Sequence, residues 1–156
     1  MTGPGRPQPS LRGRAVKLLA RRDHSRAELT KKLASLGSSE EIKTVLDQLE
    51  QTGLLSDARA AAAYVRGHAA RFGAAKLGHS LRAKGISAEL IEAILAGQEL
   101  GGELERARAL WQRKFGRLPA RAAKDVKEWA RQARFLQSRG FSAEIIRKLL
   151  KSPDDE

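Results

Sequence analysis

Apolar side chains recur every three or four positions along most of the chain, and alternating apolar and polar runs are absent. A spacing of three and four is that of helices that bury one face, whereas alternation marks strands. Proline is absent between Ser10 and Leu118, so no proline interrupts a helix in this long segment. The pattern therefore predicts an all-α fold.

One pattern occurs three times along the chain. Residues 33–42, 81–90 and 136–145 read LASLGSSEEI, LRAKGISAEL and LQSRGFSAEI. In each copy a glycine is expected to end one helix in the left-handed conformation, and a serine two positions later is expected to cap the next helix. The glycines are Gly37, Gly85 and Gly140, and the serines are Ser39, Ser87 and Ser142. Each copy is therefore predicted to be a helix, a tight turn and a second helix.

A further helix precedes each of these helix pairs. In the first copy it spans about residues 11–20, and Ser25 and Glu28 then have the spacing of a capping box. In the second copy Ser56 is placed to cap the corresponding helix. Each copy is thereby extended to three helices.

The third copy differs by a long middle helix. Gly116 is expected to end the helix before it, and Pro119 suits the first turn of a helix over about residues 120–139. The whole chain thus predicts three tandem three-helix repeats that form an elongated, curved array. The expected divisions are a disordered leader (1–9), three-helix modules (10–52, 53–98 and 99–151) and an acidic tail (152–156).

The chain carries a strong positive charge that is spread along its length. Thirty Lys and Arg residues stand against eighteen Asp and Glu residues, which gives a net charge of +12. The three modules, counted with the ends of the chain, carry +4, +3 and +5. Such a charge favours a polyanion such as nucleic acid as the partner.

Several classes of protein are excluded by composition. The chain has no cysteine, so disulfides and thiolate metal sites are ruled out, and His24, His68 and His79 lack the spacing of metal ligands. No stretch approaches the roughly 20 apolar residues that cross a bilayer, and the amino terminus lacks a secretory hydrophobic region. We expect a cytoplasmic monomer with no cofactor, no bound metal and no membrane partner.

Four segments carry a resemblance to a known family. Residues 19–29 read LARRDHSRAEL, residues 53–59 read GLLSDAR, residues 64–66 read YVR and residues 81–86 read LRAKGI. These segments and the three repeats resemble the RecX family, whose members regulate the bacterial recombinase RecA. The resemblance spans about residues 11–150.

The resemblance implies a non-enzymatic regulator in DNA repair, recombination and the SOS response. Such a protein binds in the groove of the RecA filament on DNA and inhibits recombinase, ATPase and coprotease activities, while it binds single-stranded and double-stranded DNA only weakly. Basic side chains on all three modules are the candidate RecA and DNA contacts. They are Arg21, Arg22, Arg26, Arg59, Arg66, Lys76, Arg82, Lys84, Arg113, Lys114, Arg117, Lys124, Lys127, Arg131 and Arg134.

The chain departs from the family pattern in its middle module. Relatives usually have an aromatic residue where this chain has Ala60, and they have a Gly-Pro-basic-basic-Ile segment where residues 73–77 read GAAKL. Lys76 alone keeps a charge in that segment. The departures predict that the third module contributes more of the contact than the second.

Simpler interpretations exist for several of these residues. His24 has no carboxylate pair or second histidine beside it and is expected to brace the loop before Ser25 rather than to act in catalysis. The arginines of residues 21–26 could be solvated loop charges. Trp111 and Trp129 are expected to pack in a core rather than stack on bases.

The charge and the helical pattern are also compatible with other functions. A general nucleic-acid-binding protein that acts independently of RecA is the main alternative. A reader of specific DNA sites fits less well, because the helices after the three turn glycines begin with acidic residues that repel phosphate. An enzyme fits least.

Overall fold

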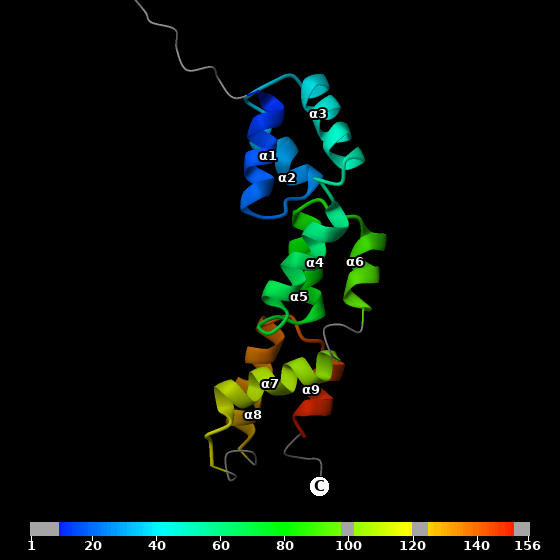
Figure 1. The fold of residues 1–156 in the computed structure, drawn as a ribbon. Coiled ribbons are helices and arrows are strands. Elements are labelled where there is room, and N and C mark those ends of the chain that lie inside the picture. Colours follow the sequence, from blue (N-terminus) through cyan, green and yellow to red (C-terminus); the bar gives the residue numbers. More distant parts are fainter. Residues whose placement is uncertain (1–9, 98–101, 120–124, 152–156) are drawn as a thin grey trace, which may run out of the picture. The chain divides into compact units, whose positions relative to one another are not determined.

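The computed structural model describes residues 10–97, 102–119 and 125–151. Over these residues it contains nine α-helices and no strand (Figure 1), which confirms the predicted all-α class. The helices are α1 (Leu11–Arg21), α2 (Arg26–Leu33), α3 (Ser39–Gln51), α4 (Asp57–His68), α5 (Ala74–Ala83), α6 (Ala88–Leu95), α7 (Glu103–Phe115), α8 (Val126–Ser138) and α9 (Ala143–Leu149). The expected leader (1–9) and acidic tail (152–156) lie outside the described residues.

The chain divides into two compact units, and each is described by itself. The first unit comprises the described residues up to Ala63 together with Lys84–Ile86. The second comprises Tyr64–Ala83 and the described residues from Ser87 onward. The division falls within the middle module of the sequence pattern.

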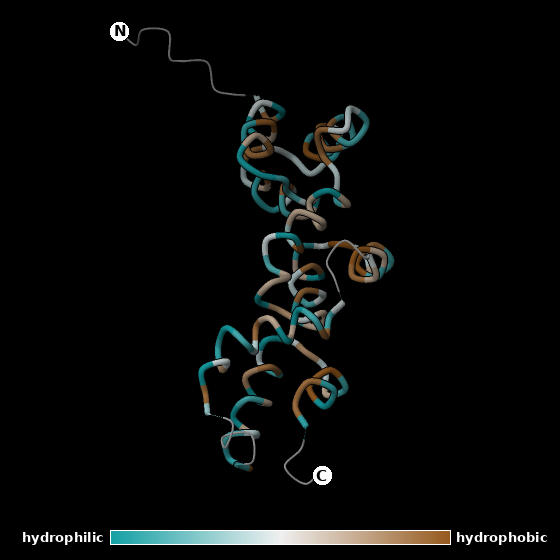
Figure 2. The backbone as a smooth tube through the Cα atoms, turned by 60° about the horizontal axis from the view of Figure 1, so that its bottom comes forward, coloured by the Kyte–Doolittle hydropathy of each residue, from teal (hydrophilic) through white to brown (hydrophobic). Residues whose placement is uncertain are grey.

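The first unit is built around helices α1, α2 and α3. These helices are amphipathic, with hydrophobic and hydrophilic positions in every turn (Figure 2). Their buried side chains form one cluster, in which each fully buried leucine contributes about 1.5–3 kcal/mol relative to an exposed one. The cluster consists of Ala15, Leu29, Leu33, Ile42, Leu46, Leu49 and Leu55.

The second unit contains a similar cluster among helices α7, α8 and α9. Its buried members are Ala107, Leu110, Leu136, Phe141, Ile146 and Leu150. Trp111 and Trp129 pack against this cluster, and Trp111 Nε1 donates a hydrogen bond of 2.7 Å to Oε1 of the buried Gln132. Both tryptophans are therefore core residues, as predicted. Helices α5 and α6 pack together in the same unit and bury Leu77 and Ile91.

Most of the predicted helix caps are confirmed. Ser25 and Glu28 form a complete capping box at the start of α2. Ser87 and Ser142 cap α6 and α9 by accepting a hydrogen bond from a backbone amide of the first turn. These polar contacts fix where the helices begin because they satisfy amides that have no partner inside the helix.

Two predictions about the first turn of the repeat are wrong. The N-cap of α3 is Ser38 rather than Ser39, because Ser38 forms a capping box with Glu41 that Ser39 could not form. Gly37 does not have a positive φ, whereas Gly85 and Gly140 do, at 78° and 91°. The turn after α2 continues with right-handed residues, since Ala34 has φ −54° and ψ −34°.

The predicted long helix over residues 120–139 is also wrong. Helix α8 begins only at Val126, and Asp125 before it is extended, with φ −86° and ψ 120°. The Asp125 side chain accepts a hydrogen bond from the Lys127 amide and so caps α8. Residues 120–124, including the expected start of the long helix after Pro119, lie outside the described residues.

In the first unit, hydrogen bonds join the start of α2 to two segments of the middle module, and we call this set of hydrogen bonds a joint. The amide of Arg26, the first residue of α2, donates to Oδ1 of Asp57 at 2.7 Å. Beside it, the hydroxyl of Ser25 donates to the carbonyl oxygen of Lys84 at 2.5 Å. The start of α2 is therefore bonded both to the first residue of α4 and to the turn that follows α5.

The second unit contains an equivalent joint at the start of α5. The amide of Ala74, the first residue of α5, donates to Oε1 of Glu103 at 3.1 Å. The amides of Gly73 and Ala75 donate to the carbonyls of residues 139–140 at 2.7 and 3.2 Å. Amides at a helix start need partners from outside the helix, and here the first residue of α7 and the turn after α8 supply them.

The two joints occupy the same positions in the sequence repeat. Lys84 and Arg139 both precede the turn glycine, and Asp57 and Glu103 both begin a helix that follows a completed three-helix pattern. The repeat in sequence is thus a repeat of contacts. Within the segment 73–77, the amides of residues 73–75 are bonded to the following module.

Candidate functional site

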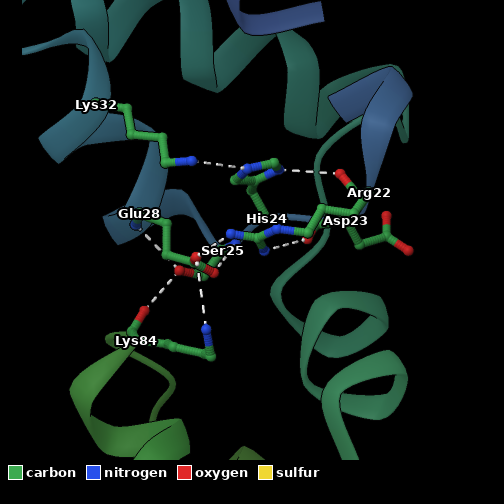
Figure 3. Close-up of polar contacts among 7 residues, drawn as sticks. All are labelled: Arg22, Asp23, His24, Ser25, Glu28, Lys32 and Lys84. Carbon is green, nitrogen blue, oxygen red and sulfur yellow. Dashed lines mark hydrogen bonds and ion pairs between the residues drawn. The ribbon is translucent and has the colours of Figure 1, made fainter. Parts of the chain in front are cut away.

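Residues 22–25 connect α1 to α2 in the first unit, and two side chains of this turn are buried. Figure 3 shows the side chains of His24, Ser25 and Glu28 pointing into a shared network of polar contacts. His24 and Ser25 are 2% and 0% exposed. The segment 19–29, which carries part of the family resemblance, therefore has a structural role at His24 and Ser25.

His24 is held in one tautomer by its neighbours. Its Nδ1 lies 2.9 Å from the carbonyl oxygen of Arg22, and its Nε2 lies 3.4 Å from Nζ of Lys32 (Figure 3). A carbonyl can only accept, so Nδ1 carries the proton and the bare Nε2 accepts from the lysine ammonium. Burial lowers the pKa of His24, and the charges of Arg22 and Lys32 act in the same direction. A neutral His24 therefore braces the turn, as predicted.

Glu28 connects this turn to the segment that follows α5. Its carboxylate accepts hydrogen bonds from the Ser25 amide at 3.1 Å and from Arg22 at 3.0 Å, and it lies 3.7 Å from Nζ of Lys84. Burial opposes ionisation of Glu28, but the amide and the two cations outweigh it, so the pKa of Glu28 is lowered. Arg22 and Lys84 therefore act as partners of a partly buried carboxylate.

Two further candidates of the first unit are also bound within it. Arg26 pairs with Asp47 at 2.8 Å and with Glu50 at 3.0 Å, and so ties α2 to α3. Arg59 pairs with Asp23 at 2.8 Å and donates to the carbonyls of residues 53–54 at 3.0 Å. These arginines hold the first unit together.

In the second unit, Arg113 and Arg106 bind the end of α4. Arg113 donates to the Ala70 carbonyl at 2.7 Å, and Arg106 donates to the Ala69 carbonyl at 3.1 Å. Both carbonyls lie just beyond the last residue of α4, where cations complement unsatisfied oxygens and the helix dipole. Arg106 was not a predicted site residue. It lies one helical turn after Glu103 on α7, and both residues bind backbone groups of residues 69–74, which run from the end of α4 to the start of α5.

Three other candidates of the second unit contact protein groups. Arg131 forms two hydrogen bonds with Glu128, at 2.7 and 3.1 Å. Lys76 donates to the Ser138 carbonyl at 3.4 Å, and its ammonium lies 4.8 Å from the centre of the Phe72 ring. Lys114 lies 5.3 Å from the centre of the Phe135 ring. These contacts reduce the freedom of the three cations to meet a partner.

Arg139 was not predicted from the sequence as a residue of this region, yet it contacts two aromatic rings. Its guanidinium lies 5.8 Å from the centre of the Phe72 ring and 5.1 Å from that of Phe135. Its position in the sequence could have indicated it, because Arg139 precedes the turn glycine as Lys84 does in the second copy of the repeat.

Six of the predicted contact residues are exposed and have no partner among the described residues. No hydrogen bond, ion pair or ring contact holds them there. They are Arg21, Arg66, Arg82, Arg117, Lys127 and Arg134. We call this group the unpaired cations. Lys124, the remaining candidate, lies outside the described residues.

The described ranges contain no group of three or more histidine, aspartate or glutamate residues that could hold a metal ion. Among the same residues, no helix is long and apolar enough to cross a membrane. The fold and the exposed cations define a helical-repeat protein that carries exposed positive charge on both of its units.

Comparison with known proteins identifies the family. The models of the first, second and third three-helix domains of RecX match residues 12–49, 56–95 and 102–150. The chain is 49% identical to the regulatory protein RecX of Leptothrix cholodnii over 152 residues, which cover 97% of this chain and 94% of the relative. It is 40% identical to the regulatory protein RecX of Chromobacterium violaceum, over 94% of this chain and 93% of the relative. The chain belongs to the RecX family of regulatory proteins, which is not a family of enzymes.

Solved structures have the same fold. The crystal structure of RecX from Lactobacillus salivarius matches with a TM-score of 0.72 and 22% identity, over 92% of this chain and 94% of that one. A second crystal structure of a regulatory protein RecX matches with a TM-score of 0.69 and 24% identity, over 90% of this chain and 71% of that one. At this level of identity the likeness supports the fold alone.

Proposed function

We propose that this chain binds the RecA–DNA filament and inhibits recombinase, ATPase and coprotease activities without catalysing a reaction itself. It acts in the cytoplasm as a monomer, in DNA repair, recombination and the SOS response. Membership of the RecX family supports the regulatory part of the proposal. The identity of the partner comes from the family resemblance.

The unpaired cations are the observation that carries the proposed contact. The first unit uses carboxylates such as Glu28 and Asp23 to bind Arg22 and Arg59. The unpaired cations have no such partner among the described residues, so a phosphate-bearing surface would neutralise them without breaking an internal contact. We therefore narrow the contact set to the unpaired cations and Lys124, and assign the bound arginines to stability.

The alternative is a protein that coats nucleic acid independently of RecA. Exposed cations alone would serve that function as well, because most protein–DNA affinity comes from phosphate contacts that any sequence offers. The two functions differ in how much protein is needed to produce an effect.

ATP hydrolysis by RecA on single-stranded DNA separates these functions. We expect inhibition at a concentration of this protein far below that needed to cover the DNA, because the filament is the target. Inhibition that begins only when the DNA is saturated, and that disappears when more DNA is added, would contradict the proposal and support the coating protein.

A further inference from the structure

The first unit contains a pocket that shares only Arg21 with the proposed filament contact. Its volume is about 520 Å³, within the range of small ligand pockets. Residues of α1, of α2 and of the turn after α2 line it. They are Arg14, Lys17, Leu18, Arg21, Lys32, Leu33 and Leu36.

The pocket combines an apolar wall with a ring of positive charge. Three leucines and four cations line it, and no acidic residue does. The sequence has no aspartate or glutamate before Asp23, so α1 supplies only positive charge to its side of the pocket. Lys17, Arg21 and Lys32 form no ion pair within the described residues.

The exposure of Leu36 indicates that the ligand of this pocket has an apolar part. Leu36 is 44% exposed, whereas the neighbouring Leu33 is 1% exposed and belongs to the core. An exposed leucine on its own needs no explanation, but this one borders a concave site beside two other leucines. Phosphates alone would leave this apolar wall uncovered.

Lys32 is restrained by one contact with the turn between α1 and α2. Its ammonium lies 3.4 Å from Nε2 of His24, which is itself held by the Arg22 carbonyl (Figure 3). A positively charged group that is held in place loses less conformational entropy when it binds a carboxylate.

We propose that this pocket binds an acidic segment of a partner protein through one bulky apolar side chain. The apolar side chain lies against the exposed Leu36 and the partly exposed Leu18, and carboxylates on either side of it pair with the surrounding cations. Charge complementarity selects an acidic segment, and the leucines select a peptide over a nucleic acid. The proposal is independent of the filament function, although Arg21 belongs to both sets.

The test measures binding of the full chain to a short fluorescein-labelled peptide by fluorescence anisotropy. The peptide has a central phenylalanine flanked on each side by a pair of aspartates. Leu36→Ser and Lys17→Glu should each weaken binding by about tenfold. The matched controls are Leu54→Ser, which changes another leucine of the same unit that is 45% exposed, and Arg12→Glu, which changes an exposed cation of α1 outside the pocket. Both controls should stay within about twofold of the unmodified protein.

Peptide variants test the proposal without changing the protein. A peptide with serine in place of phenylalanine should bind about tenfold more weakly. Equal binding of the two peptides, or no binding of either, would overturn the proposal. A labelled thymidine oligonucleotide that depends on Leu36 as strongly as the peptide does would reassign the pocket to nucleic acid.

Discussion

Glu28 joins three parts of the first unit through one carboxylate. It bonds the Ser25 amide, pairs with Arg22 and lies close to Lys84. A residue with so many partners is expected to affect stability more than an exposed capping residue does, because its loss leaves several polar groups without a partner.

We predict that Glu28→Gln destabilises the protein by about 1–2 kcal/mol at neutral pH. The folded-state pKa of Glu28 is lowered, so its contribution is present above the ordinary glutamate pKa and is lost as pH falls through the folded pKa. The difference between the two proteins should therefore shrink on acidification. Urea unfolding across this pH range measures it. Glu41→Gln, in the exposed capping box of α3, is the control and should have a smaller effect at neutral pH.

His24 predicts a second pH dependence, at higher pH. Its pKa is lowered in the folded state, mainly by burial, so the unfolded chain takes up the proton more readily. Stability from His24 is therefore complete above the ordinary histidine value of 6.5 and declines as pH falls below it. His24→Gln should remove this part of the decline, and His79→Gln, which changes an exposed histidine, should retain it. An unchanged slope in the His24 variant would show that His24 is not the group that titrates.

The residues that cap the helices could be predicted from the sequence, but the ion-pair partners of the arginines could not. Ser25 and Glu28 are three positions apart, and their spacing alone predicts a capping box. Arg26 and Glu50 are 24 positions apart, and Arg59 and Asp23 are 36 apart. Which distant charges meet depends on helix packing, so sequence reasoning left these arginines among the candidate contacts.

At the scale of helices, the sequence repeat predicted which segments are helical better than it predicted the residues at which the helices begin. Ser38 and Ser39 are adjacent, and the choice between them depended on which one has a glutamate three positions later. Pro119 suggested a helix start, but the capping side chain of Asp125 sets the start of α8 instead. The glutamate of a capping box was the better signal in the first case, and a short polar side chain that accepts an amide hydrogen bond was the better signal in the second.

The turn glycines give a test at this scale. Gly85 and Gly53 both have positive φ, at 78° and 79°, but a Cβ on Gly85 would overlap that of Ala27, whereas a Cβ on Gly53 has open space around it. Gly53→Ala should cost about 1 kcal/mol through backbone strain alone. Gly85→Ala should cost at least about 1 kcal/mol more, because it also separates the turn from α2. Equal losses in thermal unfolding would show that this contact adds nothing to stability.

At the scale of the whole molecule, the tandem repeat predicts an elongated array. Each module packs mainly against its neighbours in such proteins. A compact globule of this length would have a radius of gyration of about 15 Å. We expect small-angle X-ray scattering of the monomer to give a larger value. A radius at or below that of the globule would contradict the array.

The central claim is that the unpaired cations, which the family resemblance selects from the exposed cations of the chain, mediate filament inhibition, rather than exposed positive charge in general. Two triple variants of the third module separate these possibilities, since each reverses three exposed cations. The first changes Arg117, Lys127 and Arg134 to glutamate. The second changes Arg108, Arg147 and Lys151 to glutamate, which are also exposed but were not predicted as contacts. Far-UV circular dichroism of both variants should match that of the unmodified protein, because exposed substitutions seldom cost more than about 0.5 kcal/mol each.

The deciding measurement is the concentration of each variant that halves ATP hydrolysis by RecA on single-stranded DNA. We predict that this concentration rises at least about tenfold for the first variant and no more than about twofold for the second. Equal rises for the two folded variants, or a larger rise for the second, would contradict the assignment of the contact to the unpaired cations.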